Sequence, residues 1–207
     1  MTDSTSNGNN GTTSGGPTQT TGEVGNALSF NGTNKYVTVG NPASLQPSGN
    51  VTVSAWVKSS ASANNQTVIS KRDGSQYTSY DILSVDAGGG NVNLGFIMKK
   101  AGDPWNWAFS SALPIGTWYH VVGVYDGSYN HVYVNGVESK TAETGSPPAD
   151  SGVNVYIGRR PDGNYDPFNG LIDDVRVATT ARSADWITFE YHNIADSGHD
   201  ITFGAGQ

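Results

Sequence analysis

No cysteine occurs among the 207 residues of the chain, which excludes disulfide bonds, cysteine-ligated zinc and thiol catalysis. No apolar run approaches the roughly 20 residues of a membrane-spanning helix, so we expect no membrane insertion. The first residues also lack the basic and apolar segments of a secretory signal peptide. They form a stretch rich in Thr, Ser, Gly and Asn, and we expect the chain to be a fragment of a larger protein.

Few residues are charged, and basic residues are fewer than acidic ones. Charged residues make up 14% of the chain, and 18 acidic side chains outnumber 11 basic ones, which leaves a net charge of −7. Nucleic acids and anionic membranes are bound through basic patches. The sequence therefore predicts no nucleic-acid partner, whereas an acidic balance is compatible with cation binding.

Residue patterns typical of catalysis are also missing. A glycosidase needs two carboxylates flanking the scissile bond, which on a strand appear as acidic residues at alternate positions. Asp173 and Asp174 are adjacent, so their side chains point to opposite faces of a strand, and Glu138 and Glu143 lie near a turn. There is no nucleophile-elbow pattern, and His120 lies in an apolar run that favours a structural role. We predict that the chain is not an enzyme.

The clearest pattern present is a β-meander between residues 116 and 140. Two turn signals, Asp126-Gly127 and Asn135-Gly136, separate three runs rich in β-branched and aromatic residues. Asn-Gly is the strongest short signal for a hairpin because both turn positions need a positive φ. The three predicted strands are Trp118–Tyr125, His131–Val134 and Val137–Lys140.

The remainder of the chain continues this pattern of short strands and turns. The 27 glycines and 9 prolines suit a fold with many turns, and Val51 to Val57 alternates with one apolar face. Only Ser183 to Tyr191 has helical spacing, with Ser183 as its cap. The sequence therefore predicts an all-β, two-sheet antiparallel sandwich with one short helix near the C-terminus.

Four stretches resemble the concanavalin A-like, laminin-G-like jelly-roll domains of bacterial and archaeal secreted and surface proteins. The resemblance runs from about Glu23 to Tyr191 and implies a jelly roll and an extracellular location. It leaves function open, because this fold hosts lectins, adhesion domains and hydrolases. The matching stretches are ALSFNGTNKYVTV (27–39), VTVSAWVK (51–58), WYHVVGVYDG with VYVNG (118–136) and GLIDDVRVA (170–178).

We expect three parts along the chain. Residues 1–22 have too few apolar side chains to fold by themselves and predict a flexible linker to other domains of a parent protein, or a tail without a role. Residues 23–191 form the jelly-roll domain. Residues 192–207 form a C-terminal tail or an edge strand.

A calcium site is predicted where the first and closing strands of the domain meet. Asp173 alternates with Leu171 and Val175, so its carboxylate faces the apolar side and must be paired or bind a metal. The resemblance implies Ca²⁺ at this junction, although Asn31 stands where an aspartate would add charge. The alternative is that Asp173 accepts backbone N–H groups. The predicted ligands are Asn31, Gly32, Asn34 and Asp173.

A glycan site is predicted from aromatic and polar residues in loops. Trp105 follows the Asp103-Pro104 turn, and the loop from Arg159 to Phe168 combines aromatic rings, arginines and carboxylates. Sugars stack their C–H faces on aromatic rings while polar groups hold the hydroxyls. Trp107 and Trp118 are expected in the core. The predicted ligand-binding residues are Trp105, Arg159, Arg160, Asp162, Asn164 and Tyr165.

These observations favour one function and leave another open. We predict a non-catalytic carbohydrate-binding module of a larger secreted or surface protein, stabilised by calcium and bound to a polysaccharide or glycan. The alternative is a structural or adhesion domain that binds protein partners or spaces other domains.

Overall fold

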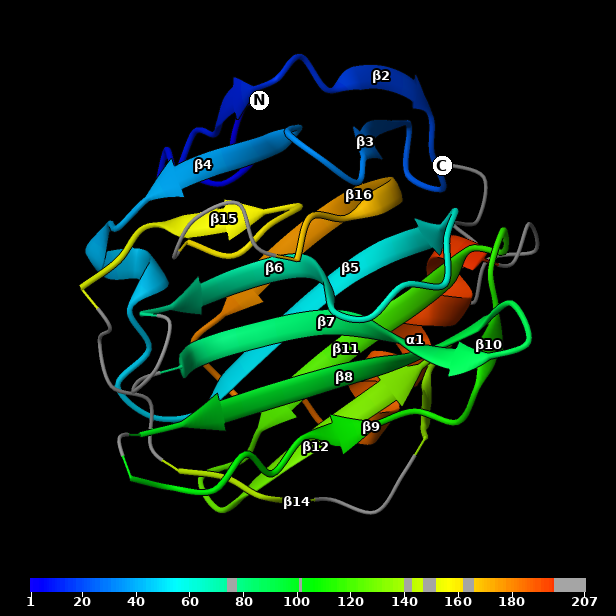
Figure 1. Cartoon of the computed structure of the whole chain (residues 1–207). Coiled ribbons are helices and arrows are strands. Elements are labelled where there is room, and N and C mark those ends of the chain that lie inside the picture. The colour runs from blue at the N-terminus through cyan, green and yellow to red at the C-terminus, as the bar shows by residue number, and fades with distance from the viewer. Residues whose placement is uncertain (74–77, 101, 140–142, 147–151, 162–165, 196–207) are drawn as a thin grey trace, which may run out of the picture.

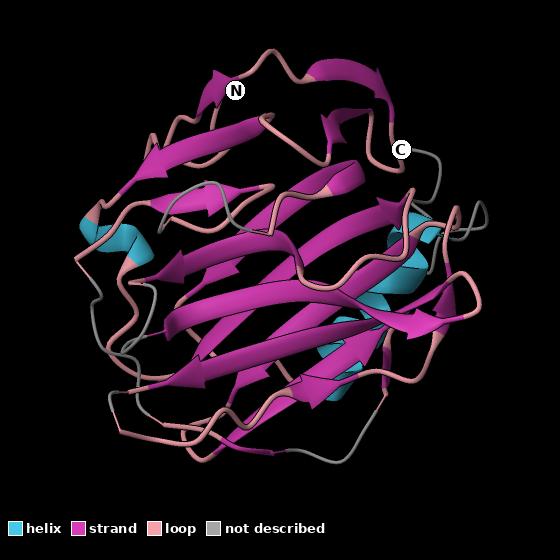
Figure 2. Ribbon diagram, viewed as in Figure 1, coloured by secondary structure: helices cyan, strands magenta, loops and turns pink. Residues whose placement is uncertain are grey.

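The computed structural model describes residues 1–73, 78–100, 102–139, 143–146, 152–161 and 166–195. Two antiparallel sheets pack face to face, and a helix covers the far side of one of them (Figures 1 and 2). Some strands that follow one another in the sequence pair directly, whereas others belong to different sheets because the chain crosses between the sheets at several loops. Within the described residues, the prediction of an all-β sandwich with one short α-helix near the C-terminus is confirmed.

Sheet A has eight strands within the described residues. Its order is β1-β4-β15-β6-β7-β8-β10, with β9 paired to β8. The strands are β1 (Thr12–Ser14), β4 (Tyr36–Gly40), β15 (Val155–Ile157), β6 (Gln66–Arg72), β7 (Thr78–Gly88), β8 (Asn91–Lys99), β10 (Leu113–Pro114) and β9 (Ala108–Phe109).

Sheet B also has eight strands in this part of the chain. Its order is β13-β12-β11-β5-β16-β3-β2, with β14 paired to β12. The strands are β13 (Val137–Glu138), β12 (Tyr129–Val134), β11 (Tyr119–Tyr125), β5 (Val51–Ser59), β16 (Asn169–Ala178), β3 (Asn26–Asn31), β2 (Thr18–Thr21) and β14 (Glu143–Thr144). A 3₁₀ turn, η1 (Ala43–Leu45), follows β4.

The core lies between the two sheets and follows the alternation of the strands. Val51, Val53, Ala55 and Val57 all join the buried cluster, as the pattern of β5 predicts. The sheets approach closely at Gly123 of β11, where an added Cβ would overlap the ring of Phe96 from β8. Glycine at this position lets the aromatic ring fill the space between the sheets.

The predicted hairpin joins β12 and β13. Asn135 and Gly136 have φ values of 51° and 79°, and Val134 pairs with Val137 across the turn. Both positive φ values are those that the Asn-Gly sequence favours, so this prediction is confirmed.

Helix α1 (Ala184–Ala195) packs on the outer face of sheet B. Ser183 Oγ accepts the backbone N–H of Trp186 at 3.2 Å, which confirms the predicted cap. Ile187 contacts Val122 and Val124, the outward side chains of β11. The helix ends at Ala195, four residues beyond the predicted end, and its place behind sheet B leaves the outer face of sheet A uncovered by α1 (Figure 1).

The N-terminal residues differ from the flexible linker that their composition predicts. Residues 12–14 pair with β4 and residues 18–21 pair with β3, so each extends a different sheet. The side chains of both strands are mostly exposed, and backbone hydrogen bonds alone define the pairing. Threonine suits a strand, but an edge strand without a buried face has no apolar alternation that sequence reasoning could detect.

Only the beginning of the predicted C-terminal tail or edge strand, residues 192–207, lies within the described residues. Residues 192–195 belong to α1, and the predicted edge strand at Ile201–Phe203 lies outside the described residues. Among the described residues, no helix is both long and apolar enough to cross a membrane.

Candidate functional site

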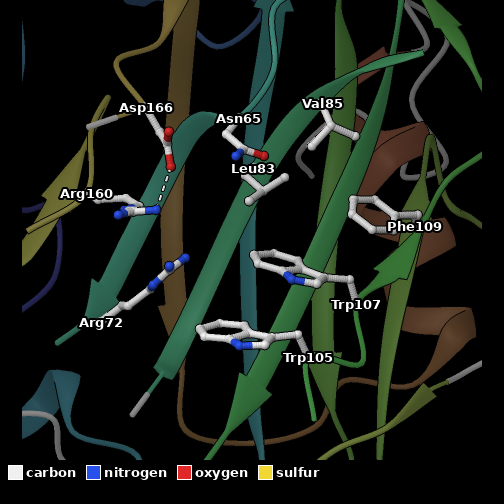
Figure 3. A pocket seen from close by; sticks show the side chains of 9 residues that line it. All are labelled: Asn65, Arg72, Leu83, Val85, Trp105, Trp107, Phe109, Arg160 and Asp166. Atoms are coloured by element: carbon white, nitrogen blue, oxygen red, sulfur yellow. Dashed lines mark hydrogen bonds and ion pairs between the residues drawn. The ribbon is translucent and has the colours of Figure 1, made fainter. Parts of the chain in front are cut away.

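A groove of about 170 Å³ lies on the outer face of sheet A. Leu83 and Val85 form part of its floor, since they alternate with the core-facing side chains of β7. Three aromatic rings stand on one side, and arginine and aspartate side chains stand on the other (Figure 3). The described lining residues are Asn65, Arg72, Leu83, Val85, Trp105, Trp107, Phe109, Arg160 and Asp166.

The aromatic side of the groove is carried by residues 102–110, which we call the strap. Its last residues form β9, where Phe109 pairs with Gly95 of β8. An added Cβ at Gly95 would overlap the Phe109 ring, so the glycine gives the ring room beside β8. Ser110 Oγ accepts the backbone N–H of Leu94 at 2.9 Å and fixes the end of the strap. The strap is therefore attached to sheet A by backbone pairing as well as by side chains.

Two tryptophans and a phenylalanine form the aromatic wall. Trp107 stacks on Phe109 with 5.8 Å between ring centroids and 22° between planes. Trp105 is 43% exposed at the rim of the groove. The expectation that Trp107 lies in the core is wrong: it is half-buried and lines the groove. Within the strap only residues 108–109 form a strand, because only they pair with β8.

Two arginine–aspartate pairs form the opposite side. Arg72 Nη1 lies 3.3 Å from Asp81 Oδ2, and Arg160 Nη1 lies 2.8 Å from Asp166 Oδ2. Asp81 is fully buried, and this burial raises the pKa of its carboxyl despite the adjacent Arg72 guanidinium. Arg72 also lies 4.7 Å from the centre of the Trp105 ring, which connects the two sides of the groove.

Trp105 has a second cation beside it. Lys99 Nζ lies 4.3 Å from the ring centroid of Trp105. Contacts of this kind hold an indole ring in place electrostatically. Lys99 and Arg72 therefore orient the ring at the rim, while its exposed part faces solvent.

The structure brings only some of the predicted ligand residues together. Trp105 and Arg160 line the same groove. Arg159 instead lies over the rings of Tyr36 and Tyr156. Three further predicted residues, Asp162, Asn164 and Tyr165, lie outside the described residues.

Sequence reasoning missed most of the groove. Asn65, Leu83, Val85 and Phe109 carry no local signal, because they are ordinary members of turns and strands that meet only in the folded chain. Arg72 does carry one: it is a charged residue in the strand β6, and a charged side chain that is buried needs a partner.

The predicted calcium ligands do not form one cluster. Asn31 pairs with Asn169, and the register places Asp173 four residues further along β16. At roughly 3.4 Å per residue this separates the Asn31 turn from Asp173 by about 14 Å. Since a shared ion needs ligands at about 2.4 Å, these residues do not fit a single calcium site.

The side-chain oxygens of Asp173 and Asn31 already accept hydrogen bonds from backbone N–H groups. Asp173 Oδ2 accepts the backbone N–H of Val24 at 2.8 Å, and its Oδ1 accepts that of Asp174 at 2.8 Å. Asn31 Oδ1 accepts backbone N–H groups within its own turn, including those of Thr33 and Asn34 at 3.2 Å. No cluster of three His, Asp or Glu side chains suited to a metal occurs among the described residues. Calcium binding stays a prediction.

The family of the chain follows from its sequence as well as from this architecture. A family model described as the concanavalin A-like lectin/glucanases superfamily matches residues 31–188. The chain belongs to this superfamily. The resemblance inferred from the strand motifs is confirmed, whereas no curated protein sequence matches the chain.

Solved structures from the same fold include sugar-binding domains. Domain 4 of an extracellular arabinanase from Geobacillus stearothermophilus, solved with arabinotriose, is 25% identical, with a TM-score of 0.64 and 86% of each chain covered. A candidate carbohydrate-binding protein from Bacteroides ovatus is 25% identical, with a TM-score of 0.58 over 77% of this chain and 45% of that one. The botulinum neurotoxin serotype D binding domain shares the fold at 15% identity, with a TM-score of 0.70 over 93% of this chain and 48% of that one. The fold of this superfamily member is therefore lectin-like.

His120 lies away from the groove, between sheet B and α1. Its ring is 5.1 Å from that of Trp56 and 6.4 Å from that of Tyr191. Burial lowers the pKa of His120 to about 4, so the imidazole is neutral at pH 7. Glu190 Oε2 is 4.0 Å from Nε2, too far for a hydrogen bond. This environment agrees with the structural role predicted for His120.

Proposed function

We propose that this superfamily member is a non-catalytic carbohydrate-binding module whose groove on sheet A holds a glycan. The observation that carries the proposal is the groove itself, where two indole rings stand opposite Arg72 and the Arg160–Asp166 pair (Figure 3). A sugar ring has apolar C–H faces and hydroxyl groups at its edge, and the two sides of the groove match these two features.

The contacts assign a separate role to each side. Trp107, backed by Phe109, offers a ring whose orientation is already set, so little entropy is lost on binding. Arg72 and Arg160 supply N–H donors, and Asp166 supplies acceptors for hydroxyl groups. The groove volume of about 170 Å³ is several times the ~30 Å³ that one water molecule occupies in the liquid. A groove of this size can hold one sugar ring.

The chemistry of the groove favours binding over hydrolysis. Glycosidases use a pair of carboxylates on either side of the scissile bond. Among the described lining residues, Asp166 is the one carboxylate, and it is paired with Arg160. The buried Asp81 lies beneath Arg72 and has no exposed surface. These residues supply recognition but not an acid–base pair.

The comparisons support the same proposal and suggest the first ligand to test. The arabinanase domain, at 25% identity, was solved with arabinotriose, so arabino-oligosaccharides are suitable first probes for this chain. Because that relative belongs to an extracellular enzyme, we further propose that this module belongs to a larger secreted or cell-surface protein.

Calorimetric titration tests the proposal directly. The wild-type chain is titrated with arabinotriose and with the strongest ligands from a glycan array. Aromatic stacking on nucleic-acid bases contributes about 1–3 kcal/mol per ring. By analogy we expect Trp105→Ala and Trp107→Ala each to weaken binding about tenfold or more without preventing folding.

Tyr129→Ala is a matched control for these variants. Tyr129 is 45% exposed, close to the 43% of Trp105, but it belongs to β12 in sheet B. Its loss should leave glycan affinity unchanged. If the wild-type chain binds no glycan on the array, the proposal fails and a structural or adhesion domain becomes the better interpretation.

A further inference from the structure

A second cluster of aromatic and cationic side chains lies on sheet A beside the groove. The guanidinium carbon of Arg159 is 4.1 Å from the centre of the Tyr36 ring and 5.2 Å from that of Tyr156. The two tyrosine rings are themselves 5.9 Å apart, and all three side chains are half-buried. The cluster is thus a surface feature with a preset geometry, contributed by β4, β15 and the residue that follows Gly158.

The cluster faces the same side of sheet A as the groove. Tyr36 and Tyr156 each alternate with core residues, Val37 and Ile157 respectively, so their rings point away from the core. Tyr156 lies directly opposite Ser70, and Ser70 lies opposite Asp81, which holds Arg72 at the groove. The cross-strand row therefore leads from the tyrosines to the groove.

The two features also meet through the chain itself. Arg159 belongs to the cluster and Arg160 lines the groove. Consecutive Cα atoms are about 3.8 Å apart, so a ligand longer than one sugar unit can reach both.

Arg159 differs from the arginines of the groove in its hydrogen bonding. Arg72 and Arg160 each meet an aspartate. Within the part of the chain that the structure describes, Arg159 makes ring contacts but no hydrogen bond or ion pair, and its buried Nε is unpartnered. Its planar group of N–H donors is thus held in place by the two rings, with its bonding capacity unused.

We propose that Arg159, Tyr36 and Tyr156 form a second subsite that binds a carboxylate-bearing sugar, a uronate, of the same glycan chain. The proposal rests on the glycan-binding function proposed above. The guanidinium group matches a carboxylate with two parallel hydrogen bonds, and such charged pairs are about twice as strong as neutral ones. A sugar carboxylate can bind Arg159 without displacing an aspartate, because no described carboxylate is paired with this guanidinium group.

A purely structural role for Arg159 can be separated from this proposal because the chain holds a matched control. Arg182 lies 4.3 Å from the ring centre of Trp186 and also has a buried, unpartnered Nε. It belongs to the segment before α1, on the sheet B side of the molecule. Substitution of Arg182 therefore removes a similar cation–ring contact without touching sheet A.

The test compares a negatively charged ligand with its uncharged ester. Trigalacturonate and its methyl ester are titrated into the wild-type chain at low and high salt, together with arabinotriose as a neutral probe. We expect wild type to bind trigalacturonate at least tenfold more tightly than the methyl ester, with the advantage shrinking as salt is added. Arg159→Gln should abolish the advantage, and Arg159→Lys, which keeps the charge but loses the planar fork, should restore only part of it. Arg182→Gln should preserve it.

The outcomes separate this inference from the proposed function. Equal affinity for the charged and esterified ligands, unchanged in a folded Arg159→Gln variant, overturns the uronate subsite while glycan binding stands. Tighter binding of a sulfated galactose trisaccharide than of trigalacturonate also overturns it, because the preferred anion would then be a sulfate. Failure to bind any oligosaccharide overturns the proposed function and the subsite together. Melting curves of each variant establish that the chain is folded.

Discussion

The buried histidine predicts a pH dependence of stability that is large enough to measure. His120 is 2% exposed, and burial lowers its pKa from 6.5 to about 4 in the folded chain. Of the nearby charges, Asp174 raises the pKa and Arg176 lowers it, but both effects are smaller than that of burial. The unfolded chain exposes the imidazole, which then titrates at its ordinary pKa.

The direction follows from proton binding. Between pH 6.5 and about 4 the unfolded chain binds a proton at His120 that the folded chain does not. The free energy of unfolding therefore holds its full value above pH 6.5 and decreases as the pH falls towards 4. Each pKa unit corresponds to ~1.4 kcal/mol, so the contribution of this one group is about 3 kcal/mol.

Two variants isolate the effect of His120. His120→Phe keeps a ring against Trp56 and Tyr191, whereas His120→Gln removes both the ring and the titration. Urea unfolding is measured from pH 7 to pH 4, and the stability of each variant is subtracted from that of wild type. For both variants we expect this difference to fall by about 3 kcal/mol across the window. At pH 7 the glutamine variant should be the less stable by ~1 kcal/mol, because aromatic pairing is lost.

Either of two results would refute the reasoning. If both variants keep the pH dependence of wild type, His120 is not held neutral by burial. A pKa for His120 near 7, measured by NMR, would contradict the burial effect in the same way and would reopen a chemical role for this side chain.

Three further changes test the fold and the predicted metal site. Asp173→Ala leaves the N–H of Val24 without its acceptor and should lower the free energy of unfolding by about 1–3 kcal/mol, equally in calcium and in EGTA; a loss confined to calcium-containing buffer would instead support an ion at Asp173. Gly123→Ala places a methyl group against the buried Phe96 ring and should lower the free energy of unfolding, measured in urea, by about 1–3 kcal/mol. Deleting residues 1–21 should speed amide exchange along β3 and β4, whereas a flexible linker would leave that exchange unchanged.

The elements that sequence reasoning predicted correctly are those with a local cause. Asn135 and Gly136 adopt the positive φ values that asparagine and glycine tolerate, so the hairpin could be predicted directly from the sequence. Ser183 caps α1 through a contact three residues away. The alternation of Val51 to Val57 predicted the buried face of β5 for the same reason, because strand periodicity is a local property.

The candidate site could be predicted only in part. Trp105 and Arg160 were expected to share a site, and the structure places both at the groove. Trp107 was expected in the core because an aromatic side chain more often packs in a core than binds a ligand. Its position at the groove wall depends on the path of the strap across β8, which no short-range pattern encodes.

The sequence by itself determined the fold class, the hairpin, the helix start and the family, because alternation, turn chemistry and capping act within a few residues. Only the tertiary structure decided which distant side chains meet. The register of β3 against β16 separates Asn31 from Asp173, although both belong to neighbouring strands. The turn after Gly158 sends Arg159 to the tyrosines and Arg160 to the groove. Such choices depend on strand pairing and on packing across the sheets, so they are made only when the whole chain has folded.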